Sequence, residues 1–238
     1  MKLVHDATAS ASPVWDVGSA SLLWAEGTTV HRLHPASDTH AEIVVPQRIG
    51  AALPRTNGGL VGNLREGIGL RDIDDRLTWL VYWHRDSAEA GPATIDPAGN
   101  LWAATGDQLI RVRPDGRATV VLDGVTITGI AAGDRLHIAT AQGVAVFDPD
   151  TGDRTPLCAA PAAGLCVDAD GGVWVAVPDA NEIRRITPTG DLDRVLDVPG
   201  PTGCCFGGPD FTDLYLTAGP IFVVPTIGTG APTPRFPG

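Results

Sequence analysis

The sequence predicts an all-β protein, a six-bladed β-propeller whose blades are four-stranded antiparallel sheets. Three observations favour this fold. One unit recurs from end to end of the chain at the spacing of a propeller blade. The 29 glycines and 20 prolines indicate many tight turns. Long helix-forming runs are scarce. We expect residues 1–238 to form a single domain.

The repeat is clearest in its second strand, where an aromatic or bulky residue is flanked by aliphatic residues. Six such positions follow one another at intervals of 35 to 41 residues: Trp24, Val61, Trp102, His137, Trp174 and Tyr215. This interval is typical of propeller blades. No segment of the chain is left outside the six copies.

Each copy also contains a short apolar strand before the aromatic one and two strands after it. The first and second strands are joined by turns rich in Asp and Gly, such as residues 96–99 and 168–171. The third strand alternates its faces, and the fourth is more polar, as expected for a blade edge. The last copy lacks a fourth strand after residues 221–224. We expect residues 2–5 to supply it and so close the ring.

Composition excludes several function classes. A net charge of −11 does not favour binding to nucleic acid or to anionic membranes. No segment has the length of a membrane span or of a signal-peptide core, so we expect a cytoplasmic, soluble monomer. The four cysteines show no CxxC or Cys/His spacing and are expected to be small buried side chains. P-loop, GxSxG, HExxH and EF-hand motifs are absent.

Several motifs together resemble the gluconolactonase/regucalcin (senescence marker protein) family, over nearly the whole chain. They include SPVWD at 12–16, IDPAGNLWAAT at 95–105, GLCVDADGGVWVAV at 164–177, FGGPDFTDLYLTAG at 206–219 and PTPRFPG at 232–238. The resemblance implies a six-bladed lactonase with a divalent cation at the mouth of the central channel.

The metal positions that the resemblance implies are substituted in this chain. Ala11, Thr128 and Ala163 stand where the family has Glu, Asn and Asp, and Gly91 stands where it has a substrate-contacting Asn. A hard cation needs oxygen ligands, and one Thr hydroxyl cannot replace its water shell. We therefore predict no metal and no cofactor, unless a divalent cation is bound by relocated ligands such as Glu26, Asp107 or Glu89.

Candidate site residues are then sought in the loops at the channel mouth. Glu26 and His84 are the candidate catalytic acid and base. Six further residues are candidates for substrate binding: Tyr82, Trp83, Arg65, Thr128, Thr202 and Asp107. Tyr82 and Trp83 stand in a blade-crossing segment, where aromatic side chains could form the wall of a pocket for an apolar ligand. Each of these side chains could instead serve packing or solvation.

Three functions remain open at this point. The first is a metal-independent enzyme that carries out a cyclisation or isomerisation on a small apolar substrate in bacterial secondary metabolism, which needs only orientation and one acid or base. The second is a metal-dependent lactone hydrolase with relocated ligands. The third is a propeller that binds a small ligand without catalysis.

Overall fold

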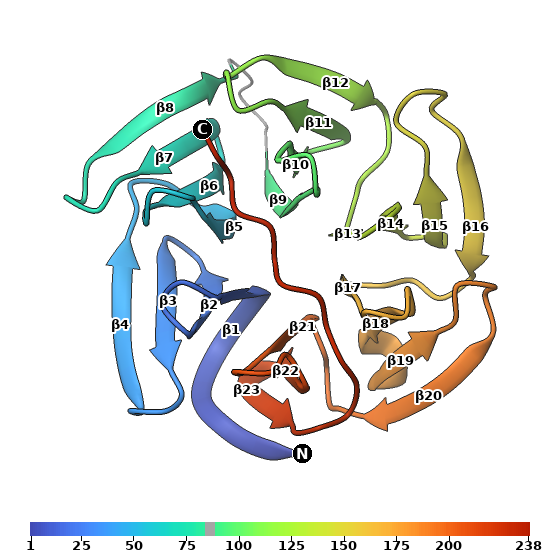
Figure 1. The fold of residues 1–238 in the computed structure, drawn as a ribbon. Helices are drawn as coiled ribbons and strands as arrows, with labels where there is room; N and C mark the ends of the chain where they lie inside the picture. The colour runs from blue at the N-terminus through green and yellow to red at the C-terminus, as the bar shows by residue number, and fades with distance from the viewer. Residues whose placement is uncertain (84–88) are drawn as a thin grey trace.

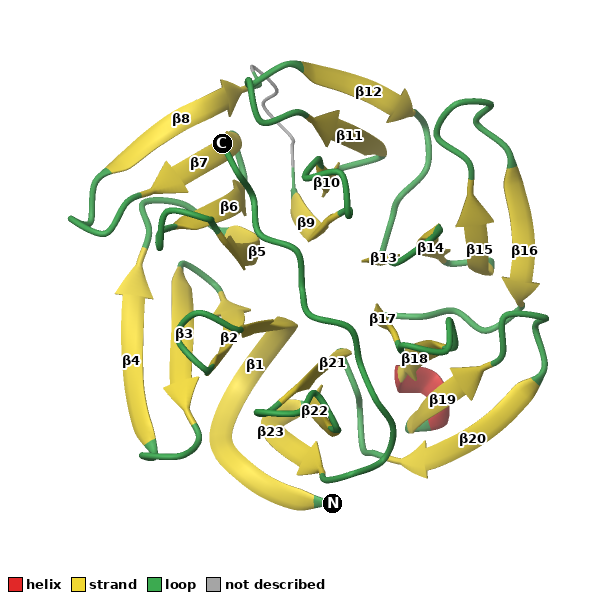
Figure 2. Cartoon of the chain, viewed as in Figure 1, coloured by secondary structure: helices red, strands yellow, loops and turns green. Residues whose placement is uncertain are grey.

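The computed structural model describes residues 1–83 and 89–238, and nearly all of its regular structure is β-strand (Figures 1 and 2). The strands form antiparallel sheets arranged around a central axis, with one strand of each sheet next to the axis and one at the rim (Figure 1). This arrangement is consistent with the predicted propeller. The one helical segment in the described residues is a short 3-10 turn, η1 (Pro178–Ala180).

Four of the sheets contain four strands each, in chain order from axis to rim. The first consists of β5 (Ile49–Pro54), β6 (Leu60–Leu64), β7 (Gly67–Arg71) and β8 (Leu77–Tyr82). The second consists of β9 (Ala90–Ile95), β10 (Leu101–Thr105), β11 (Gln108–Val112) and β12 (Ala118–Leu122). The third consists of β13 (Gly129–Ala132), β14 (Leu136–Thr140), β15 (Gly143–Phe147) and β16 (Arg154–Cys158). The fourth consists of β17 (Gly164–Val167), β18 (Val173–Val177), β19 (Glu182–Ile186) and β20 (Leu192–Asp197).

The fifth sheet has seven strands because the long first strand, β1 (Lys2–Asp16), is shared. Its later residues pair with β2 (Ser21–Glu26), which is followed by β3 (Thr29–His34) and β4 (Thr39–Val44). Its earlier residues, from Lys2 to Ser10, pair with β23 (Gly219–Val224), next to β22 (Asp213–Thr217) and β21 (Gly203–Gly207). The two ends of the chain are thus hydrogen-bonded to each other, as Figure 1 shows.

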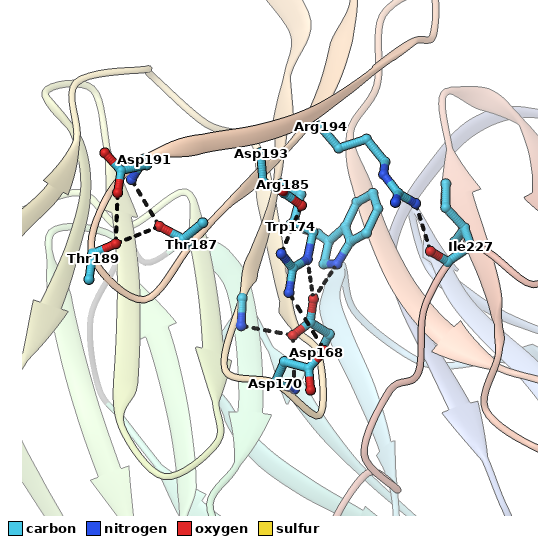
Figure 3. Close-up of polar contacts among 11 residues, drawn as sticks. Asp168, Asp170, Trp174, Arg185, Thr187, Thr189, Asp191, Asp193, Arg194 and Ile227 are labelled. Atoms are coloured by element: carbon cyan, nitrogen blue, oxygen red, sulfur yellow. Dashed lines mark hydrogen bonds and ion pairs between the residues drawn. The ribbon is translucent and has the colours of Figure 1, made fainter.

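The second strand of every sheet lies in the core, and it carries the repeat positions found in the sequence. Trp24, Trp102 and Trp174 are at most 2% exposed, and they lie in β2, β10 and β18. Two of these indoles donate a hydrogen bond to an aspartate of the preceding turn: Trp102 to Asp96 at 2.8 Å, and Trp174 to Asp168 at 2.9 Å (Figure 3). The Asp and Gly turns therefore hold the buried tryptophans as well as connecting the strands.

The C-terminal segment crosses one face of the ring, from β23 past the axis towards β7 (Figure 1). Gly230 forms a bridge with Asp168, and Phe236 forms one with Arg55, which follow β17 and β5 directly. The side chain of Phe236 is fully buried, and Arg235 contacts Asp16 at 2.9 Å. All these contacts are with residues at the ends of innermost strands. The segment therefore covers the face of the ring where the innermost strands end, opposite the face where they begin.

Candidate functional site at the mouth of the ring

The mouth, defined here as the end of the ring where the innermost strands begin, is narrow because glycines bring the strands together. A side-chain Cβ added to Gly129 would lie 3.1 Å from Gly164 Cα. One added to Gly164 would lie 2.8 Å from Gly203 Cα, and one added to Gly203 would lie 2.9 Å from Cδ of Pro13. The innermost strands of neighbouring sheets are thus in backbone contact on this side of the axis.

The cavity at the mouth is small and uncharged. It has a volume of about 50 Å³, and Ala163 and Thr202 are among the residues that line it. Its described lining residues include no carboxylate, imidazole, guanidinium or ammonium group. A divalent cation of the kind that the resemblance implies needs several oxygen ligands, so the residues present at the mouth do not fit one.

The two threonines predicted to bind substrate, Thr128 and Thr202, donate hydrogen bonds to backbone carbonyl oxygens. Thr128 Oγ1 donates to the carbonyl oxygen of Ala162 at 2.5 Å, and Thr202 Oγ1 lies 2.7 Å from the carbonyl oxygen of Ser10. Buried Asn63 makes a similar link, since its Nδ2 donates to the carbonyl oxygen of Gly91 at 2.9 Å. The bonds of Thr128 and Asn63 link neighbouring sheets, and the bond of Thr202 links the start of β21 to β1 within the seven-stranded sheet.

Three of the predicted substrate-binding residues come together on the sheet of β5 to β8. The Trp83 indole donates to the carbonyl oxygen of Arg65 at 3.2 Å, and the Trp83 backbone N–H donates to the carbonyl oxygen of Glu66 at 2.9 Å. Glu66 Oε2 accepts from Tyr82 at 3.2 Å and from the Gln47 side chain at 2.6 Å. We call Gln47, Arg65, Glu66, Tyr82 and Trp83 the Glu66 cluster.

The carboxylate of Glu66 is the chemical centre of this cluster. Its hydrogen bond with Tyr82 and its charge raise the pKa of the Tyr82 phenol, so the hydroxyl stays protonated and donates. Tyr82 is 55% exposed, and Glu66 is half-buried. Gln47 was not predicted, although its position just before an innermost strand places it at the mouth end of the ring.

The other predicted residues lie elsewhere. Glu26 accepts a hydrogen bond from Thr8 at 2.5 Å and lies 3.8 Å from Nε2 of His31. It therefore contacts residues of β1 and β3, and it is not among the residues that line the mouth cavity. Asp107 lies in the turn between β10 and β11, where its carbonyl oxygen accepts from the Val125 backbone N–H. His84 lies outside the described residues. The catalytic assignments of Glu26 and His84 stay predictions.

A larger cavity, of about 430 Å³, lies at the opposite end of the axis under residues 231–234 of the C-terminal segment. Its lining includes Asp134, Arg135, His137 and Asp168. Burial, followed by the nearby Arg135, lowers the pKa of His137 to about 4, so this imidazole is neutral near pH 7. Asp168 is already bonded to Trp174 and Arg185, and the cavity combines a neutral imidazole with structural carboxylates.

Comparison with known proteins agrees with this architecture. The family model of the SMP-30/gluconolactonase/LRE-like region matches residues 9–129 and 162–219. A 6-deoxy-6-sulfogluconolactonase of Pseudomonas putida is 29% identical, with 87% of this chain and 81% of that protein covered. Regucalcin of Xenopus laevis is 26% identical, with 87% of this chain and 82% of that protein covered. Among solved structures, a calcium-binding regucalcin of Agrobacterium tumefaciens superposes with a TM-score of 0.90 at 18% identity, over 99% of this chain and 96% of that one.

The fold and the match to the family model therefore define a propeller of the lactonase type. The chain belongs to the SMP-30/gluconolactonase/LRE-like family, and the resemblance seen in its sequence is confirmed. In the described residues, no helix is long and apolar enough to cross a membrane.

Proposed function

We propose that this protein is a lactone hydrolase that works from the Glu66 cluster and not from the ring positions used by its family. Family membership supports the substrate class, because a relative that matches most of the chain is named as a sugar-lactone hydrolase. The observation that carries the proposal is the half-buried carboxylate of Glu66, held by Gln47 and Tyr82 at the mouth end of the ring. A fixed carboxylate with a phenol donor is suited to proton transfer.

In the proposed reaction, Glu66 takes a proton from a water molecule, whose oxygen attacks the lactone carbonyl carbon. The ring C–O bond then breaks, and the proton passes from Glu66 to the leaving alkoxide oxygen. The product is the open hydroxy acid, so all atoms of lactone and water are accounted for. Tyr82 would keep its hydrogen bond to Glu66 and so hold the carboxylate in place, and Trp83 would form the wall beside the substrate.

The test is hydrolysis of sugar δ-lactones, followed by acid release and corrected for uncatalysed opening. Glu66→Gln is expected to lower kcat/KM by roughly 10²- to 10⁴-fold, the usual loss when a general base is removed. Glu182→Gln is the matched control, because Glu182 is also at the mouth end of a sheet and is paired with Arg184 at 2.6 Å. Hydrolysis should persist after treatment with a chelator. Equal activity of Glu66→Gln and wild type would contradict the proposal.

The mouth itself favours a second candidate, a propeller that binds a small ligand without catalysis. Its cavity of about 50 Å³ has no charged group among its described lining residues, and the hydroxyls of Thr128 and Thr202 donate to the carbonyl oxygens of Ala162 and Ser10. This candidate predicts saturable lactone binding by calorimetry with no acid release above background. The hypothesis of a cyclisation or isomerisation enzyme receives no support from the relatives of this chain, and we do not propose it.

For the scaffold, we propose one domain over residues 1–238 with six blades, the last of which is completed by residues 2–5. The pairing of Lys2 with Val223 and of His5 with Ile221 supports this count, because it divides the seven-stranded sheet into two blades that share β1.

A further inference from the structure

We propose that His31, His40 and Glu42, on the flank of strands β3 and β4, form a binding site for a zinc ion. One ligand atom from each residue lies within 4.8 Å of the other two. This site is separate from the mouth and does not depend on the proposed hydrolase function. Two imidazoles and one carboxylate are a ligand set that suits zinc and leaves a fourth position open.

The register of the sheet explains why the three side chains meet. His31 on β3 is directly opposite Trp24 on β2 and Glu42 on β4, so these three share one face of the sheet. His40 is two residues before Glu42 and therefore lies on the same face. Such a site cannot be recognised as a sequence motif, because its ligands come from two strands and from a particular register.

The two imidazoles already occupy a geometry close to that of metal ligands. His31 Nδ1 and His40 Nε2 lie 3.0 Å apart, and the rings are inclined by only 9° with centroids 5.2 Å apart. The two nitrogens thus meet nearly head-on and share one proton. Two ligand nitrogens on tetrahedral zinc lie roughly 3.3 Å apart. Zinc would bind once each ring turns in its own plane towards the ion and the shared proton moves to the other nitrogen of its ring.

Neighbouring groups favour the required protonation state and orientation. Glu26 Oε2 lies 3.8 Å from His31 Nε2, which favours a proton on Nε2 and leaves Nδ1 free to bind zinc. The Trp24 indole is stacked on His31 at 5.0 Å and on His40 at 5.6 Å, and it fixes both ring planes.

The test is zinc titration of the tag-free, chelator-treated protein by calorimetry, with cobalt absorption as a second measurement of a tetrahedral site. We expect one zinc ion per chain. Glu26→Gln should weaken zinc binding roughly 10- to 100-fold, the usual cost of removing a residue that orients a ligand, and His40→Gln and Glu42→Gln should weaken it further. Circular dichroism checks that the variants fold.

His34→Gln is the matched control, because His34 is on the same strand β3 but contacts Ser37 instead of the cluster. It should bind zinc like the wild type. The proposal is overturned if zinc does not bind, or if His40→Gln and Glu42→Gln bind it as tightly as the wild type, since the ion would then be held elsewhere.

Discussion

At the scale of single residues, Asp168 illustrates how one buried carboxylate can organise a blade. It is 6% exposed and accepts hydrogen bonds from the backbone N–H of Gly172, from the Trp174 indole and from Arg185 Nε at 2.6 Å (Figure 3). The turn at 168–171 was predicted from its Asp and Gly residues. The link to Arg185 was not predicted, because it depends on the register between β18 and β19.

Asp168→Asn is expected to lower the free energy of unfolding by about 3 kcal/mol, because it leaves the guanidinium of Arg185, partly buried, without its closest carboxylate. Urea unfolding measures this loss. Asp96→Asn is the comparison, since Asp96 makes the same bond to Trp102, at 2.8 Å, but pairs with no arginine among residues 1–83 and 89–238. We expect it to cost only about 1–2 kcal/mol, and an equal cost for the two variants would contradict the role given to Arg185.

At the scale of elements, the innermost strands determine what the mouth can hold. The sequence places small residues at their beginnings, and the resemblance identifies Ala11, Thr128 and Ala163 as the substituted metal positions. The structure adds that β13, β17 and β21 approach so closely that their glycines are in contact. The same segments thus maintain the ring and make its mouth narrow.

Gly164→Ala is expected to destabilise the protein by about 1–3 kcal/mol, because its Cβ would lie 2.7 Å from the carbonyl oxygen of Thr202, which is backbone and cannot turn away. Thermal unfolding provides the measurement. Gly133→Ala is the control, as its Cβ would meet only the Val167 side chain at 3.3 Å. If the two variants melted at the same temperature, the close approach of β17 and β21 would not affect stability, and this prediction would be wrong.

At the scale of the whole molecule, the two ends of the chain hold the ring together in different ways. β1 joins two halves of a seven-stranded sheet at the circumference. The C-terminal segment joins residues on different sheets across the axis, through Asp168, Arg55 and Asp16. These contacts link residues far apart in the sequence, so their loss should affect the ring as a unit.

Phe236→Ala is expected to lower the free energy of unfolding by about 3–5 kcal/mol, because the fully buried ring leaves a cavity. The measurement is the midpoint of the urea unfolding curve, compared between variants whose unfolding free energy has the same dependence on urea concentration. Ile73→Ala, at a residue 73% exposed, serves as the control and should change stability by at most about 0.5 kcal/mol. A small effect of Phe236→Ala would mean that the segment lies on the ring without holding it.

The sequence by itself determined the all-β class, the repeat and the buried tryptophans, and through its resemblance to the family it predicts that the metal positions are substituted. Each of these is a local pattern of side chains along one strand or turn. Only the tertiary structure decided which side chains meet: Gln47 with Glu66, Thr128 with Ala162, and His31 with His40 and Glu42. These contacts depend on strand register and on the approach of neighbouring sheets, which are set by packing of the whole ring and are not written in any single segment.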